Sequence, residues 1–321
     1  MEAFPEFGIE RQGDNNYNGK DVRIEKMRRF LQLLLLAATL LFTMGRIAHA
    51  QENLDVKCIP SVVPQGNLCL VTASGPESLE SVHGEFNGQE FRMAPVRRNG
   101  RFQGLLGIDM KANPGIYELK VVAVDRDQSV FTEVSTLKVE KVRFGIQRLT
   151  LPPDKVDLDA KTLARVRKET ARMRTVLESY RDERLWKGAF VRPVEGEITT
   201  PFGVRRILNG QERSPHTGVD LRAAEGTPVR VCNRGVVALV DEFFFSGKSV
   251  VLDHGWGMYS MYFHLSEVFA RQGDILAKGD IFGLAGSTGR ATGPHLHWGI
   301  RLNGAKVDPL SILEFSKQLE E

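Results

Sequence analysis

Residues 293–299 read Gly-Pro-His-Leu-His-Trp-Gly, so two imidazoles alternate with apolar side chains and a glycine stands at each end. Successive side chains of a β-strand point to opposite faces of the sheet, and this spacing therefore predicts a strand with both imidazoles on one face. We expect His295 and His297 to lie side by side on a β-sheet in the C-terminal part of the chain.

A second stretch, residues 214–221, reads Ser-Pro-His-Thr-Gly-Val-Asp-Leu. Its proline and glycine disfavour a helix. On an extended chain His216 and Asp220 project to the same side, and Gly218 between them leaves room for an ion. The stretch predicts two ligands that converge on one metal.

A third alternating stretch, residues 259–265, reads Tyr-Ser-Met-Tyr-Phe-His-Leu and predicts that His264 lies on the face of Tyr262 and Ser260. Five of the seven histidines of the chain lie between residues 216 and 297. The remaining histidine of this region, His254, is flanked by turn residues, and we interpret it as a structural imidazole outside the site.

These residues suit a catalytic zinc site, which typically has three protein ligands and one open position for water. His216, Asp220 and one histidine of the His295/His297 pair can bind the ion. The other histidine and His264 then remain free to act on the water and on the substrate. The donor set predicts metal-assisted hydrolysis. A serine triad is disfavoured, because no Gly-x-Ser-x-Gly turn is present.

The three stretches together resemble the motifs of the lysostaphin-type zinc endopeptidases, the M23 metallopeptidase family. The resemblance covers roughly residues 190–312 and rests on His216-x3-Asp220, Tyr262-x-His264-Leu265-Ser266 and Gly293-Pro294-His295-Leu296-His297. The Phe202-Gly203-x-Arg205 segment and the Gly286-Ser287-Thr288-Gly289 turn also resemble features of the family.

The resemblance implies one zinc ion held by His216, Asp220 and His297, with His264 and His295 as general base and transition-state stabiliser in either order. It further implies a hydrolase, a zinc metalloendopeptidase that cleaves cross-links or stem peptides of peptidoglycan in the bacterial cell wall by attack of water activated by zinc. The alternative is a non-catalytic or latent module of the same fold that binds peptidoglycan or activates a cell-wall amidase. All five positions are intact, which favours the enzyme.

Four parts are expected along the chain, and the fold class is mainly β. Residues 188–321, with glycine-punctuated β-like runs, form the antiparallel β catalytic domain of the lysostaphin type. Residues 145–187 form a linker with an amphipathic helix whose apolar seam covers barely two and a half heptads, too few for a coiled coil, so a monomer is favoured. Residues 51–144 resemble an immunoglobulin-like β-sandwich, because turn pairs separate short alternating strands such as residues 116–124.

Residues 1–50 are expected to be an N-terminal preface and a signal peptide. The apolar stretch 30–44 follows Arg28-Arg29 and precedes Ala48-His49-Ala50, as in secretory signals. Met27 is a candidate for the true start. We expect the protein to be exported, and the periplasm is the first expected compartment. Secretion is one alternative, and anchoring in the membrane by an uncleaved N-terminal segment is another.

Composition agrees with an exported globular protein. The chain is 42% hydrophobic and 26% charged with a net charge of +3, which gives no electrostatic case for nucleic acid as a partner. Cys58 and Cys69 are close enough in the sequence to pair, whereas Cys232 is expected to be a small buried apolar residue.

Overall fold

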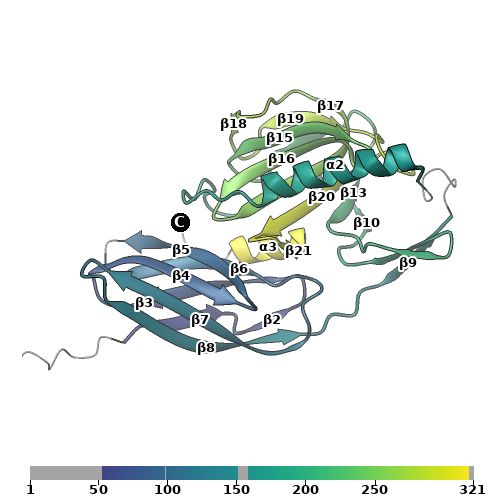
Figure 1. The fold of residues 1–321 in the computed structure, drawn as a ribbon. Coiled ribbons are helices and arrows are strands. Elements are labelled where there is room, and N and C mark those ends of the chain that lie inside the picture. The colour runs from purple at the N-terminus through teal and green to yellow at the C-terminus, as the bar shows by residue number, and fades with distance from the viewer. Residues whose placement is uncertain (1–52, 98, 151–157, 318–321) are drawn as a thin grey trace, which may run out of the picture. The chain divides into compact units, whose positions relative to one another are not determined.

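The computed structural model describes residues 53–97, 99–150 and 158–317, and residues 53–321 belong to one compact unit (Figure 1). Predictions about the start codon, the signal peptide and a membrane anchor fall on residues 1–52 and lie outside the described residues. Across the described ranges, no helix is long and apolar enough to span a membrane.

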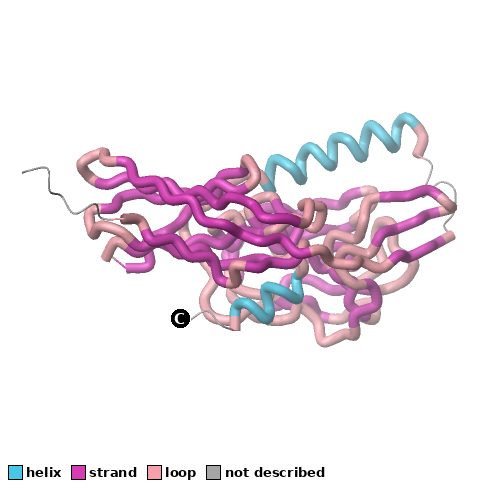
Figure 2. The backbone as a smooth tube through the Cα atoms, turned by 90° about the horizontal axis from the view of Figure 1, so that it is seen from below, coloured by secondary structure: helices cyan, strands magenta, loops and turns pink. Residues whose placement is uncertain are grey.

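Strands make up most of the described backbone, as predicted for a mainly β chain (Figure 2). The N-terminal part is an eight-stranded sheet in the order β1-β3-β6-β5-β4-β7-β8-β2, in which β2 pairs with β8 in parallel and the other neighbours are antiparallel. Its strands are β1 (Asp55–Ile59), β2 (Val62–Pro64), β3 (Leu68–Ser74), β4 (Leu79–Phe86), β5 (Gln89–Arg97), β6 (Arg101–Gly107), β7 (Gly115–Asp125) and β8 (Val130–Glu140).

The strand predicted over residues 116–124 is found as β7. Leu119, Val121 and Ala123 are buried on one face, because the apolar positions alternate with the period of a strand. Tyr117 on the same face is half-buried. The immunoglobulin-like assignment of this region remains a prediction.

The two cysteines of this region lie on neighbouring strands. The Sγ atoms of Cys58 on β1 and Cys69 on β3 are 2.7 Å apart, and both residues are thiols in the structure. Their disulfide remains a prediction, which this proximity supports.

The connecting segment contains β9 (Ile146–Leu149) and α2 (Ala160–Leu177). Asp159 caps the helix by accepting a hydrogen bond from the Thr162 N–H. No helix residue is fully buried, and three side chains, Met173, Val176 and Leu177, pack against the C-terminal sheet. The segment expected to be a linker with an amphipathic helix also supplies a strand, because β9 pairs in parallel with β11.

The C-terminal part is a ten-stranded sheet whose main path runs β10-β13-β20-β17-β16-β15-β18, with antiparallel neighbours. Its strands are β10 (Ile198–Thr200), β13 (Val219–Arg222), β14 (Pro228–Arg230), β15 (Gly235–Phe243), β16 (Gly247–Gly255), β17 (Met258–Val268), β18 (Ile275–Leu276), β19 (Ile281–Ala285), β20 (His295–Leu302) and β21 (Ala305–Val307). A separate hairpin of β11 (Arg205–Leu208) and β12 (Gln211–Arg213) forms a small sheet with β9, and the chain continues into α3 (Pro309–Ser316).

Figure 1 shows α2 running along the strands of this sheet. Polar contacts hold it at the end of β15, where Glu169 accepts a hydrogen bond from the Phe244 N–H and Arg172 pairs with Asp241. Together with the three apolar side chains, these contacts place the helix over one face of the C-terminal sheet.

Candidate metal centre and active site

His216 lies in the extended segment just before β13 and is fixed by backbone pairing. Its N–H donates to the Val204 carbonyl, and the Gly203 N–H donates to the His216 carbonyl, both at 2.9 Å. Its Nδ1 lies 2.8 Å from the Pro201 carbonyl oxygen, which can only accept. We therefore assign the proton to Nδ1, which leaves Nε2 as a lone pair facing the site.

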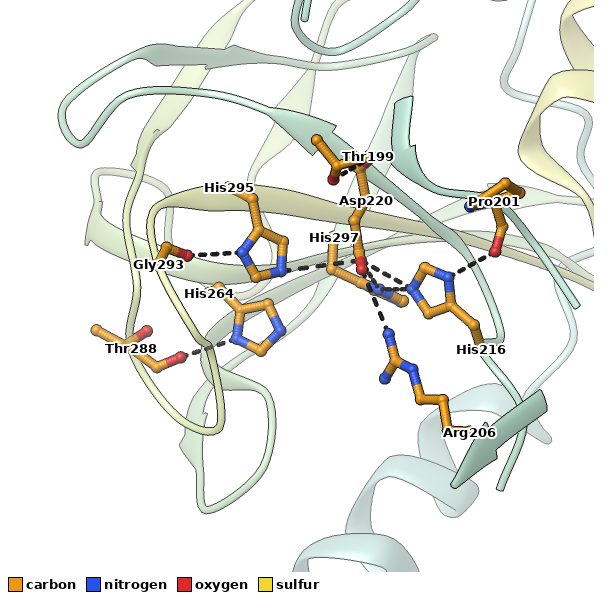
Figure 3. A network of polar contacts seen from close by, with 10 residues as sticks. All are labelled: Thr199, Pro201, Arg206, His216, Asp220, His264, Thr288, Gly293, His295 and His297. Carbon is orange, nitrogen blue, oxygen red and sulfur yellow. Dashed lines mark hydrogen bonds and ion pairs between the residues drawn. The ribbon is translucent and has the colours of Figure 1, made fainter. Parts of the chain in front are cut away.

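Asp220 and His297 are brought opposite each other by strand register. They are directly paired across β13 and β20, so their side chains share one face of the sheet. Asp220 Oδ1 lies 2.8 Å from His216 Nε2 and 2.8 Å from His297 Nδ1, and the two nitrogens are 2.9 Å apart (Figure 3). All three residues are buried.

This arrangement fits a bound cation. With its proton on Nδ1, the His216 ring directs the Nε2 lone pair at the carboxylate oxygen, and two acceptors at 2.8 Å repel unless a positive charge lies between them. In the described part of the chain, one group of three histidine, cysteine or acidic residues could hold a metal ion. It consists of His216, Asp220 and His297, whose ligand atoms lie within 4.8 Å of one another. The structure thus supports a metal site of two imidazoles and one carboxylate.

The ionisation of these residues favours the form that binds metal. Burial alone would raise the pKa of Asp220, but its close contacts with the His216 and His297 rings outweigh burial and hold this pKa well below its usual range. Burial lowers the pKa of His297 to about 3, against the opposing effect of Asp220. An anionic carboxylate beside a neutral imidazole is the ligand state that metal ions require.

His264 and His295 lie beside this group, and the Nδ1 of each ring faces a backbone carbonyl. His264 Nδ1 is 2.8 Å from the Thr288 carbonyl oxygen, and His295 Nδ1 is 2.8 Å from that of Gly293. Both rings therefore donate through Nδ1 and keep Nε2 for the site, and their centroids are 4.8 Å apart. His295 Nε2 lies 3.8 Å from Asp220 Oδ1 (Figure 3). Two further imidazoles thus face His216, Asp220 and His297, which together form the metal group.

His264 departs from the strand alternation expected from the sequence. It has a φ of 63°, in the left-handed region that few non-glycine residues adopt, and its N–H donates to the Ser246 carbonyl instead of continuing the ladder. The predicted placement of His264 on the face of Tyr262 and Ser260 is therefore wrong. The backbone twist turns its ring to the opposite face, where it meets His295 and His297.

Burial keeps His264 neutral. It lowers the pKa of this imidazole to about 4, and the neighbouring His295 acts in the same direction. At neutral pH the Nε2 lone pair of His264 is therefore available to accept a proton.

Gly218 has a different role from the one expected. A Cβ atom built on it would lie 2.3 Å from the Trp298 carbonyl oxygen and 2.8 Å from His297 Nε2. The space beside Gly218 thus admits the ring of a ligand instead of an ion. The Phe263 ring stacks on the other side of His297, at 5.2 Å between centroids and 3° between planes, and fixes its orientation.

Arg206 was not identified from the sequence. Its Nη2 lies 3.3 Å from Asp220 Oδ2, so the carboxylate presents Oδ1 to the imidazoles and Oδ2 to the guanidinium (Figure 3). Arg205, the arginine of the Phe202-Gly203-x-Arg205 segment, points instead to Glu212 in solvent. Adjacent arginines on a strand face opposite ways, and the sequence does not say which one faces the site.

His254 lies outside this site. Its Nδ1 is 2.9 Å from the Arg234 carbonyl oxygen and its Nε2 is 2.7 Å from Ser260 Oγ. Both ring nitrogens have neutral protein partners, and Cys232 is buried beside it.

Comparison with known families agrees with this candidate metal site. Residues 214–309 match the model described as Peptidase family M23, so this segment, which contains all five candidate site residues, is an M23 domain.

Among individual proteins, 128 residues of the chain are 40% identical to the DD-carboxypeptidase/endopeptidase Mpg of Neisseria meningitidis serogroup B, covering 39% of this chain and 30% of Mpg. A stretch of 121 residues is 36% identical to the peptidoglycan DD-endopeptidase ShyA of Vibrio cholerae, covering 37% of this chain and 28% of ShyA. The matched part of the chain thus spans less than a third of the length of these curated relatives.

A solved structure assigned to peptidase M23 from Pseudomonas aeruginosa superposes with a TM-score of 0.60 at 26% identity, over 79% of this chain and 95% of that one. This likeness extends well beyond the 96 residues of the family match. The fold is therefore shared over much of the region N-terminal to the M23 segment.

Proposed function

We propose that this protein is a zinc-dependent endopeptidase that hydrolyses peptide cross-links or stem peptides of bacterial peptidoglycan. The observation that carries the proposal is the convergence of His216 Nε2, Asp220 Oδ1 and His297 Nδ1, beside the two open Nε2 atoms of His264 and His295. The substrate class is supported by ShyA, a relative named as a peptidoglycan DD-endopeptidase.

Two imidazole nitrogens and one carboxylate oxygen are donors typical of catalytic zinc sites, so His216, Asp220 and His297 would hold the ion. When bound, zinc would supply Lewis acidity, which polarises the scissile carbonyl and lowers the pKa of water to about 7. Arg206 holds the second oxygen of Asp220, which leaves Oδ1 facing the two imidazoles.

The two remaining imidazoles are equipped to move the proton. His264 or His295 can accept a proton from the attacking water at Nε2, because Nδ1 of each ring is committed to a backbone carbonyl. The resulting N–H can then donate to the developing oxyanion or return the proton to the leaving amine. Either ring can serve as the base, and single variants separate the two roles.

Location follows from the substrate. Peptidoglycan lies outside the cytoplasmic membrane, so we propose that the chain is exported by the segment around residues 28–50. The periplasm is the proposed compartment, with secretion or anchoring as alternatives, and the working form is proposed to be a monomer.

A non-catalytic module that binds peptidoglycan or activates a cell-wall amidase is the alternative from another functional class. Such a module needs neither a set of converging metal ligands nor adjacent proton acceptors. The presence of both in one buried group favours the enzyme.

The test is digestion of purified peptidoglycan by the full chain with zinc, with chelator, and with zinc restored, followed by mass analysis of the released peptides. Chelator-sensitive loss of cross-linked fragments is the expected result, and the masses identify the bond. The His264→Ala variant is the control for contaminating hydrolases. A protein that retains zinc but leaves every cross-link and stem peptide intact would overturn the proposal.

A further inference from the structure

A cavity of about 540 Å³ lies between α2 and the C-terminal sheet. Its floor is apolar and includes Phe243, Met261 and Phe263, while Met173 and Leu177 of α2 form the opposite wall. The helix contributes few apolar contacts over its length, which leaves this space between it and the strands.

The cavity lies next to the metal group, although none of the three residues of that group lines it. Phe263 lines it and stacks on His297, and Thr217 lines it directly after His216. Ser246, a third lining residue, accepts the hydrogen bond of the His264 N–H. A peptide chain that extends from the site in this direction would reach the cavity.

Two cations, Arg174 and Arg301, line this cavity, and Arg174 is already paired with Glu178. Arg301 lies four residues after His297 on β20, so both side chains leave the same face of the sheet, roughly 13 Å apart along the strand. Tyr259 is its cross-strand partner.

The guanidinium of Arg301 is short of partners. Its Nη1 is buried without a hydrogen bond, and no carboxylate of the described ranges forms an ion pair with it. Asp109, whose charge acts on Arg301, uses its two oxygens to accept from the Lys111 and Lys306 N–H groups. Burial lowers the pKa of Arg301 to about 10, which still leaves it charged at neutral pH.

We propose that this cavity is a substrate subsite in which Arg301 binds a carboxylate of the peptide whose scissile bond lies at the metal group. An apolar floor beside a half-buried cation without an ion-pair partner is complementary to an extended peptide with an acidic group. The two carboxylates of the lining, Glu169 and Glu178, are both paired with arginines of the helix. The spacing fits a carboxylate up to about four residues from the scissile bond. This inference rests on the proposed function and narrows its substrate class to acidic peptides.

A purely structural Arg301 would support α2 or neutralise Asp109, and it would not distinguish acidic from neutral peptides. The test therefore compares two substrates, namely cross-linked peptidoglycan fragments with free carboxylates and the same fragments converted to amides. The full-length zinc-loaded protein is compared with Arg301→Gln and Arg301→Lys, and Arg230→Gln removes an exposed arginine outside the cavity as the matched control. Thermal unfolding and zinc content establish that each variant is folded and loaded.

The wild type is expected to favour free carboxylates by roughly 10- to 100-fold in kcat/KM, mostly through KM, as for a hydrogen bond to a charged group. Arg301→Gln should abolish this preference, Arg301→Lys should restore part of it, and Arg230→Gln should retain it. Equal losses on both substrates, or hydrolysis by the wild type without preference, would overturn the inference.

Equilibrium binding of the same two fragments separates this inference from the proposed function. Weaker binding of the acidic fragment by Arg301→Gln, in a protein that cleaves neither fragment, would support the subsite and contradict the enzyme. Equal binding of both fragments by the wild type would contradict the subsite, whatever the activity.

Discussion

Two buried imidazole groups lie on opposite faces of the same sheet. On one face His254 contacts Ser260 and Cys232, and both of its nitrogens face neutral protein atoms. On the other face His216 and His297 direct nitrogens at one carboxylate oxygen of Asp220. Tyr262 and Phe263, adjacent on β17, face the first and the second group respectively.

The comparison shows that burial of histidines does not by itself mark a metal site. Burial lowers the pKa of His254 to about 4 and that of His297 to about 3, so both rings are neutral. The two groups differ in the atom that the Nε2 of the imidazole contacts. The Nε2 of His254 meets a hydroxyl that can donate, whereas the Nε2 of His216 meets a carboxylate that cannot.

The largest effect is expected at the metal ligands. His216→Ala or Asp220→Ala should abolish metal binding and lower activity by more than the ~10²–10⁴-fold that loss of one acid–base group costs. Metal content per folded protein and peptide release measure this. His254→Gln, on the other face, should retain its metal, and a metal-free His254→Gln protein would erase the distinction between the two groups.

A smaller effect is expected at the imidazole beside the ligands. His264→Ala should lower kcat by about 10²–10⁴-fold, because a proton acceptor is lost while the three ligands remain. Zinc analysis of the purified variant is the second measurement, and His295→Ala is its counterpart. Loss of zinc from His264→Ala would make this ring a ligand and not a proton carrier.

The buried imidazole of His254 should contribute to the pH dependence of stability, as should His264 and His297, whose pKa values burial also lowers. The pKa of His254 is about 4 in the folded state and about 6.5 when unfolded, so the unfolded chain binds the extra proton between these values. Its neutral burial gives full stability above pH 6.5, and about 3 kcal/mol of unfolding free energy is lost as the pH falls to 4.

Urea unfolding of the metal-free protein from pH 7 to pH 4 measures this loss, and His254→Gln should flatten the slope. If the variant and the wild type have the same slope, other groups account for the acid sensitivity.

The smallest effect is expected at Arg206, whose guanidinium contacts the candidate metal ligand Asp220. Arg206→Gln should weaken zinc affinity by about 10- to 100-fold, the usual cost of losing a group that orients a ligand. Competition with a chelator of known affinity measures it. Arg205→Gln is the matched control, because Arg205 pairs with Glu212 in solvent and should leave the affinity unchanged. If both substitutions weaken zinc affinity equally, the net charge of the protein and not the orientation of Asp220 determines the affinity.

Local periodicity predicts much of the site. The alternation around His295 and His297 correctly predicts a strand, and the register of β20 against β13 and β17 then places His297 beside Asp220 and Phe263. These features depend on neighbours in the sequence and on strand pairing, which a pattern of period two encodes.

The rest depends on contacts that no local pattern contains. The left-handed backbone of His264 arises from pairing with a distant segment. Pairing with distant segments also decides that Arg206, and not Arg205, faces the site. The strand β9 within the expected linker has the same origin, since its partner β11 lies in the C-terminal half. Such placements follow from tertiary structure and override local preference.

The pairing of β9 with β11 also bears on how the catalytic region can be isolated. The central strand of this small sheet is β11, so a fragment beginning at residue 188 would leave one whole side of β11 without backbone partners. Open strand edges recruit other chains, and such a fragment is therefore expected to self-associate. A fragment starting before Ile146 would keep the edge covered and preserve the strand that carries Arg206.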